Sequence, residues 1–170
     1  MLSDKILASL NRQHGAEIAA FYLYRAMQSY FLDHNLDGFA QWMNTQANEE
    51  LEHAGKIYDY IHDRGGAVKL SAIDAPKQDW KSPLEVIQDA YDHEKKVSTM
   101  IHDLIDEAVS EKDRATEVML QWFVAEQVEE EALFDRVYQR VKFAGDSPTA
   151  LLLIDQEMGA RPTSGGEGEV

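Results

Sequence analysis

The chain has 170 residues, no cysteine, and 31 Asp and Glu against 16 Lys and Arg, which leaves a formal net charge of −15. Its length predicts a single domain. Without cysteine, disulfides, zinc-thiolate sites, iron–sulfur clusters and cysteine nucleophiles are excluded. The acidic surplus argues against nucleic acid and anionic membranes as partners and favours cations. No signal-peptide pattern opens the sequence, and the longest apolar run, 150–154, is far too short for a membrane span, so we expect a cytoplasmic protein.

Capping residues and breaks predict four long helices in chain order. Ser3 is placed to cap a first helix that ends near Asn35, and Asp37 is placed to cap a second that stops at 65–66. The Ser-Pro-Leu-Glu sequence at 82–85 combines a capping serine, a first-turn proline and a capping-box glutamate, and so predicts the start of a third helix. A fourth helix follows a weak stretch at 110–113 and ends near residue 145.

The connections between these helices predict their directions. The first and second helices are joined by a short turn, as are the third and fourth, so each pair is expected to be antiparallel. The segment 67–81 can span about 50 Å when extended, which exceeds the roughly 42 Å length of the second helix. We therefore expect an all-α four-helix bundle, about 3–145, with one long crossover from the second helix to the third. A short fifth helix is expected at about 147–158, which completes the domain 1–158, and a disordered Gly/Glu-rich tail at 159–170.

One glutamate interrupts the apolar row of each long helix. Seven residues turn an α-helix by about 700°, so positions seven apart share a face. Read at this spacing, the rows Leu10–Tyr24, Met43–Ile57, Ile87–Ile101 and Phe123–Val137 contain Glu17, Glu50, Glu94 and Glu130, one in each helix. A single such glutamate is more often at the edge of the stripe, with its carboxylate in water. Four of them, one per helix, would repel one another in a common core, which indicates a site for multivalent cations.

Further candidate ligands flank these glutamates on the second and fourth helices. His53 follows Glu50 by three residues and therefore faces the same way. The other polar residues of the two arcs are Glu49, Glu126, Gln127 and Glu129. Many oxygen donors with one imidazole and no sulfur suit iron or manganese. If Glu50 bridges two ions, Glu17 and His53 can complete the first position. Glu94 and Glu130 can then complete the second. The spacing indicates a dinuclear carboxylate site but does not select iron.

The chain resembles the prokaryotic non-haem ferritins in four stretches: 11–24 (NRQHGAEIAAFYLY), 48–54 (NEELEHA), 91–94 (YDHE) and 122–132 (WFVAEQVEEEA). The resemblance covers about residues 3–158 and implies the ferritin-like bundle. It implies iron storage and detoxification by a ferroxidase, which oxidises Fe(II) to Fe(III) with O2 or hydrogen peroxide at a di-iron centre within each subunit. Ferric mineral would collect inside a hollow homo-oligomer of about 24 subunits.

The same resemblance implies roles for individual residues. The first iron would be held by Glu17, Glu50 and His53. The second would be held by Glu50, Glu94 and Glu130, with Gln127 beside it and Tyr24 hydrogen-bonded to a first-site ligand. A third iron position maps onto Glu49, Glu126, Glu129 and Glu130. No haem is expected, because Leu51 stands where bacterioferritins carry the haem-ligating methionine, and the fourth helix lacks their second ligating histidine.

Two other functions are compatible with the same pattern. One is a di-iron oxidase or peroxidase that stores no iron, and the other is a non-catalytic helical interaction module. The fifth helix also has two interpretations, since it can pack around a fourfold axis of the shell or simply cover the end of its own bundle. Glu117, near the start of the fourth helix, is a candidate for an acidic iron-entry pore.

Overall fold

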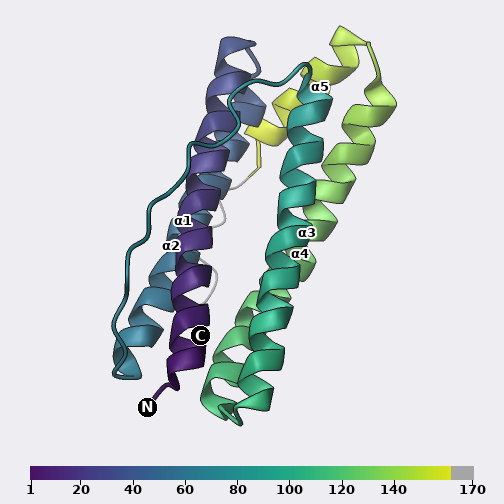
Figure 1. Cartoon of the computed structure of the whole chain (residues 1–170). Coiled ribbons are helices and arrows are strands. Elements are labelled where there is room, and N and C mark those ends of the chain that lie inside the picture. Colours follow the sequence, from purple (N-terminus) through teal and green to yellow (C-terminus); the bar gives the residue numbers. More distant parts are fainter. Residues whose placement is uncertain (162–170) are drawn as a thin grey trace.

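Five α-helices make up the fold in this computed structural model, which describes residues 1–161 (Figure 1). The helices are α1 (Asp4–Asp33), α2 (Asp37–Asp63), α3 (Pro83–Ser110), α4 (Arg114–Ala144) and α5 (Pro148–Gly159). Within the described residues there is no β-strand, so the predicted all-α four-helix bundle with a short fifth helix is confirmed. α5 includes Gly159, the first residue of the predicted disordered tail, and Ala160 is its C-cap. Residues 162–170 of that tail lie outside the described residues.

The four long helices form two antiparallel hairpins, α1–α2 and α3–α4, as the short connections predict (Figure 1). Residues with positive φ, where an L side chain is rarely found, make the tight turns: Asn35 before α2, Gly65 after α2 and Lys112 before α4. The crossover 67–81 contains no helix and runs along the outside of the first hairpin from one end of the bundle to the other. It therefore sets α3 parallel to α2.

Side-chain caps fix most of the helix starts. Ser3, Ser82 and Ser147 each accept a hydrogen bond from a backbone N–H in the first turn of α1, α3 and α5, respectively. The prediction that Asp37 caps α2 is wrong, because α2 begins at Asp37 itself and its N-cap residue, Leu36, supplies no side-chain bond. Asp155 of α5 takes this role instead, since its Oδ1 accepts from the Phe39 N–H at 2.8 Å.

The α2–α5 contact leaves no room for a side chain at Gly38. A Cβ built there would lie 1.7 Å from the carbonyl oxygen of Asp155. α5 buries Ile154 and Met158 against the bundle, whereas Leu152 and Leu153 are about half exposed. The fifth helix thus covers the end of its own bundle and still presents an apolar face to the outside.

The buried apolar side chains form two clusters separated along the bundle axis. One contains Tyr24, Met43 and Phe134 near the α5 end, and the other contains Leu10, Ile101 and Phe123 near the opposite end. In each long helix, buried polar residues lie between the residues of one cluster and those of the other: Glu17 in α1, Glu50 in α2, Glu94 in α3 and Gln127 in α4. No helix in residues 1–161 is long and apolar enough to cross a membrane.

Candidate metal centre

Polar residues occupy the middle of the bundle, where the interrupted apolar rows place them. Glu17, Glu50 and Glu94 are buried, with exposed fractions of 1%, 5% and 2%, and Glu130 is partly buried. None of these four forms an ion pair with Lys or Arg in the described part of the chain. Because unpaired carboxylates are almost never fully buried without a compensating partner, this layer has the composition of a cation site.

Glu17, Glu50 and His53 converge from α1 and α2. Each of them offers a ligand atom, and these atoms all lie within 4.8 Å of one another. The Nδ1 atom of His53 is 3.4 Å from Oε2 of Glu50. Glu17 Oε2 and Glu50 Oε2 are both buried, and neither accepts a hydrogen bond from any group in residues 1–161. Three ligand atoms thus converge, two of them carboxylate oxygens with an unused acceptor, and together they could hold one cation.

Glu94 of α3 is held on the other side of the layer by neutral donors. Tyr24 donates its hydroxyl hydrogen to Glu94 Oε1. The expectation that Tyr24 bonds a ligand of the first iron position is therefore wrong, because Glu94 is assigned to the second. Gln127 donates from Nε2 to Glu94 Oε2 at 3.0 Å and also lies 3.3 Å from the Glu94 carbonyl oxygen. These bonds from α1 and α4 orient the Glu94 carboxylate while leaving it able to bind a cation.

Burial raises the pKa values of these carboxyl groups. The pKa of Glu17 and that of Glu50 are well above the ordinary value, chiefly because burial disfavours the charged form and secondly because neighbouring carboxylates repel it. Burial and the charge of Glu94 raise the pKa of Glu130 to about 8. Burial raises the pKa of Glu94 too, although the hydrogen bonds from Tyr24 and Gln127 oppose the rise. At pH 7 the Glu130 carboxyl group therefore retains a proton that a bound cation would displace.

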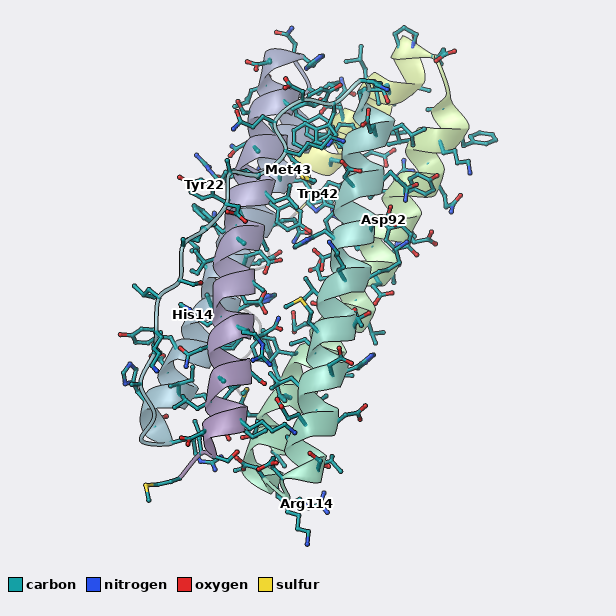
Figure 2. The ribbon with its side chains drawn as sticks, viewed as in Figure 1. His14, Tyr22, Trp42, Met43, Asp92 and Arg114 are labelled. Atoms are coloured by element: carbon teal, nitrogen blue, oxygen red, sulfur yellow. The ribbon has the colours of Figure 1, made fainter. Side chains whose placement is uncertain are left out.

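α2 and α4 face each other across the layer in an antiparallel register. Their Cα atoms nowhere approach within 8 Å among the described residues, so long side chains fill the space between them. Trp42 packs against Phe134 at one end of this register, with ring centroids 4.7 Å apart and the rings tilted by 32°. At the other end His53 packs edge-on against Trp122 and Phe123, at 5.3 and 5.8 Å. Figure 2 shows Trp42 in the space between the two hairpins and Tyr22 on the outer side of α1.

The residues predicted for a third iron position are more exposed than the di-iron set. Glu49 and Glu126 are partly buried, and Glu129 is exposed. Burial raises the pKa of Glu49 to about 7, and the charge of Glu126 contributes to the rise. Glu49 and Glu126 thus lie near each other, between the centre and the surface, whereas Glu129 has no hydrogen bond or ion pair within residues 1–161.

Several polar residues that support the centre were missed by the sequence analysis. Gln13 donates to Glu17 Oε1 at 2.8 Å, and Gln46 donates to Glu49. Ser98 lies 3.4 Å from Gln127 and donates to Glu131. Gln13 and Gln46 each stand four residues before a predicted ligand, Glu17 and Glu50, so the helical i, i+4 spacing could have found them.

The fold and the site together define a class of protein: a four-helix bundle with a buried, carboxylate-rich centre for hard cations within a single chain. Residues 7–144 match the family described as the ferritin-like domain. The chain is 41% identical over 161 residues to a bacterial non-heme ferritin of Bacteroides fragilis. The aligned residues make up 95% of this chain and 100% of the relative. It is 40% identical to a bacterial non-heme ferritin of Staphylococcus aureus, over 95% of this chain and 97% of the relative.

Solved structures agree with these relatives. One described as a novel open pore ferritin from the hyperthermophilic archaeon Archaeoglobus fulgidus superposes with a TM-score of 0.94 at 45% identity, over 95% of this chain and 99% of that one. The chain therefore belongs to the ferritin family, and the predicted resemblance to prokaryotic non-haem ferritins is confirmed. Membership of this family supports a role in iron storage.

Proposed function

We propose that this chain is a ferroxidase that oxidises Fe(II) to Fe(III) at a di-iron centre inside each subunit, with O2 or hydrogen peroxide as the oxidant. Iron is the substrate, and its ferric product collects as mineral in the cavity of a hollow homo-oligomer of about 24 subunits. The observation that carries the proposal is the convergence of Glu17, Glu50 and His53 in a buried layer that no Lys or Arg among the described residues neutralises.

The donor set favours two iron positions that share Glu50. Glu17, Glu50 and His53 would hold the first Fe(II), and Glu50, Glu94 and Glu130 the second. Two irons match the chemistry, since reduction of O2 to hydrogen peroxide takes two electrons and two protons, and each Fe(II) supplies one electron. Carboxylate oxygens also favour the product, because the more highly charged Fe(III) gains more from hard anionic ligands than Fe(II) does.

The remaining residues of the layer would position the ligands and move the product. Gln127 lies beside the second position, and Tyr24 holds Glu94. Glu49, Glu126, Glu129 and Glu130 would form a third position through which Fe(III) leaves. Protons released from the carboxyl groups when Fe(II) binds would be available to the reduced oxidant.

Exposed apolar side chains support assembly with other copies of the chain. Phe143 at the end of α4 is almost completely exposed, and Leu152 and Leu153 of α5 are about half exposed. A groove between α4 and α5 is lined by Phe143, Ala150 and Leu153. Exposed apolar surface of this kind is typical of an interface, and closed assembly would enclose the space needed for mineral.

The test is to add Fe(II) in air, at tens of ions per chain, and to measure particle mass and the iron content of the isolated protein. A large, closed oligomer that retains ferric iron is expected. A small oligomer that oxidises Fe(II) but releases all of it would identify an oxidase that stores nothing. Slow oxidation at the rate of protein-free buffer would contradict the ferroxidase proposal.

A further inference from the structure

Ser98 of α3 and Glu131 of α4 form a hydrogen-bonded pair beside the buried carboxylate layer. The Ser98 hydroxyl group donates to Glu131 Oε1. Ser98 is buried and Glu131 is partly buried. Within residues 1–161, Glu131 forms no ion pair. Neither residue belongs to the ligand sets of the proposed centre, so this polar contact between α3 and α4 has a role that those sets do not explain.

The pair is joined to the metal centre through Gln127. Nε2 of Gln127 lies 3.0 Å from Glu94 Oε2, 3.3 Å from the Glu94 carbonyl oxygen and 3.4 Å from Ser98 Oγ. Glu94 and Ser98 stand one turn apart on α3, and their faces coincide. Gln127 and Glu131 stand one turn apart on α4 in the same way. The hydrogen bonds therefore form a chain from the partly buried Glu131 to the buried carboxylate of Glu94.

The Glu131 carboxylate fixes the direction in which the Ser98 hydroxyl group points. A hydroxyl group has one hydrogen, and an ionised carboxylate can only accept hydrogen bonds. Ser98 therefore gives its hydrogen to Glu131, and its Oγ atom offers only a lone pair to Gln127. When a bound cation keeps Glu94 ionised, all three oxygens around Gln127 Nε2 are acceptors.

This set of acceptors selects one orientation of the Gln127 amide. Rotation by about 180° about the Cγ–Cδ bond exchanges Nε2 with Oε1, and such sp³–sp² torsions are broad and roughly two-fold. In the rotated amide, Oε1 would face the oxygens of Ser98 and Glu94 without a donor among them. A Ser98 hydroxyl group that was free to turn could donate to Oε1 and stabilise the rotated amide. Glu131 prevents this because it holds the Ser98 hydrogen.

We propose that Ser98 and Glu131 are positioning residues for the second iron position, because they hold the Gln127 amide with its N–H group toward Glu94. This inference rests on the proposed ferroxidase function and extends it to two residues that touch neither iron position. Gln127 acts on the second iron through Glu94, as a donor to its carboxylate.

The orientation of Gln127 matters because the Glu94 carboxylate has one donor on each oxygen. Tyr24 donates to Oε1, and Gln127 donates to Oε2. With both bonds in place the plane of the carboxylate is fixed, and each oxygen keeps a lone pair for the cation. A rotated Gln127 would free one side of Glu94 and weaken the second position.

The experiment is a double-mutant cycle in the full-length protein. Ser98→Ala removes the hydroxyl group, Gln127→Met removes the amide and keeps the length of the side chain, and a third variant carries both changes. Ser110→Ala, at an exposed serine of the same helix, is the matched control. Anaerobic titration with Fe(II) measures the affinity of each ion. Mössbauer spectra at two Fe(II) per chain distinguish the first position, which includes a histidine, from the second, which has only oxygen ligands.

For Ser98→Ala we expect the first Fe(II) to bind as in the unmodified protein and the second to bind at least about threefold more weakly. Glu131→Met should have the same effect. Gln127→Met should weaken the second position by about tenfold. The double variant should bind the second Fe(II) as weakly as Gln127→Met alone, because Ser98 acts only through the amide. Normal affinity in Ser98→Ala or Glu131→Met would overturn the proposal, as would a double variant in which the two factors multiply.

Thermal unfolding of the metal-free variants separates this inference from the ferroxidase proposal. The loss of Tm in the double variant should be smaller than the sum of the two single losses, because both single changes break the same contact between Ser98 and Gln127. Additive losses would overturn the inference whether or not iron binds. If the unmodified protein binds Fe(II) but does not oxidise it, the ferroxidase proposal fails, and the affinities still decide the role of Ser98 and Glu131.

Discussion

Tyr24 of α1 donates its hydroxyl hydrogen to Glu94 of α3 and so joins the two hairpins inside the buried carboxylate layer. Tyr24 is completely buried, and its pKa is raised, first by burial and then by the charge of Glu94. Tyr24 is therefore a neutral donor at neutral pH. A hydrogen bond to a charged group contributes about 1.5–3 kcal/mol, so this contact has a measurable effect on the site.

The variant Tyr24→Phe removes this donor and keeps the ring. Within residues 1–161, Glu94 then retains Gln127 as its one side-chain donor. Its carboxylate is less well oriented, and we expect about tenfold weaker binding at the second iron position. Oxidation of the first two Fe(II) per chain should slow accordingly. Tyr22→Phe, at a half-exposed tyrosine on the outer side of α1, should leave both quantities unchanged. Equal rates for the two variants would show that the Tyr24 hydroxyl does not act on the site.

Glu50→Ala should eliminate rapid iron oxidation, because Glu50 is the ligand shared by both proposed positions. Glu17→Ala should weaken the first position and slow the reaction strongly. Glu52→Ala, at an exposed glutamate on the same helix as Glu50, is the control and should oxidise Fe(II) normally. Stopped-flow absorbance at two Fe(II) per chain measures all three. Normal oxidation by both Glu50→Ala and Glu17→Ala would favour a non-catalytic helical module.

The stability of the metal-free protein should fall as the pH rises. The folded-state pKa of Glu130 is about 8 and that of Glu49 is about 7, both above the ordinary value of 4.5. Between about pH 4.5 and pH 8 the folded protein binds more protons at these two groups than the unfolded chain does. The free energy of unfolding therefore decreases as the pH rises through this range. The stabilising contribution of Glu49 and Glu130 is fully present below about pH 4.5 and is lost above about pH 8.

Thermal unfolding of chelator-treated protein between pH 5 and pH 8.5 measures this effect. The Tm should decrease over the range, and Glu130→Gln should make the decrease shallower, because the amide does not titrate. A divalent cation should raise the Tm most at the high end, where the carboxylates are free of protons. A Tm that rises with pH for the metal-free protein would contradict the pKa directions of the layer.

The docking of α5 depends on the absence of a side chain at Gly38. Gly38→Ala should destabilise the fold by about 1–3 kcal/mol, because the new methyl group would overlap the Asp155 carbonyl and disturb the Asp155–Phe39 cap. Gly55→Ala on the same helix is the control. A Cβ there meets nothing within 4 Å, so this change should stabilise α2 by about 0.5–1 kcal/mol. Chemical denaturation compares the two variants, and similar effects from both would refute the close packing.

The seven-residue spacing predicted three of the buried glutamates, although Glu126 meets the same rule and is only partly buried. It worked because one periodic rule governs each helix separately, and Glu17, Glu50 and Glu94 are indeed buried. Contacts that depend on how two helices approach each other were beyond that rule. The capping of α2 by Asp155 joins residues 116 positions apart. A local sequence pattern therefore could not predict it. Gln46 was overlooked for another reason, since a glutamine near an apolar row carries no charge to mark it as unusual.

The most direct test of the account is the position of iron in crystals of the protein soaked anaerobically with Fe(II) and measured at the iron absorption edge. Two anomalous peaks are expected in each chain: one among Glu17, Glu50 and His53, and the other among Glu50, Glu94 and Glu130. Iron found only at exposed carboxylates, with this buried layer empty, would contradict the central claim that the layer is the ferroxidase centre.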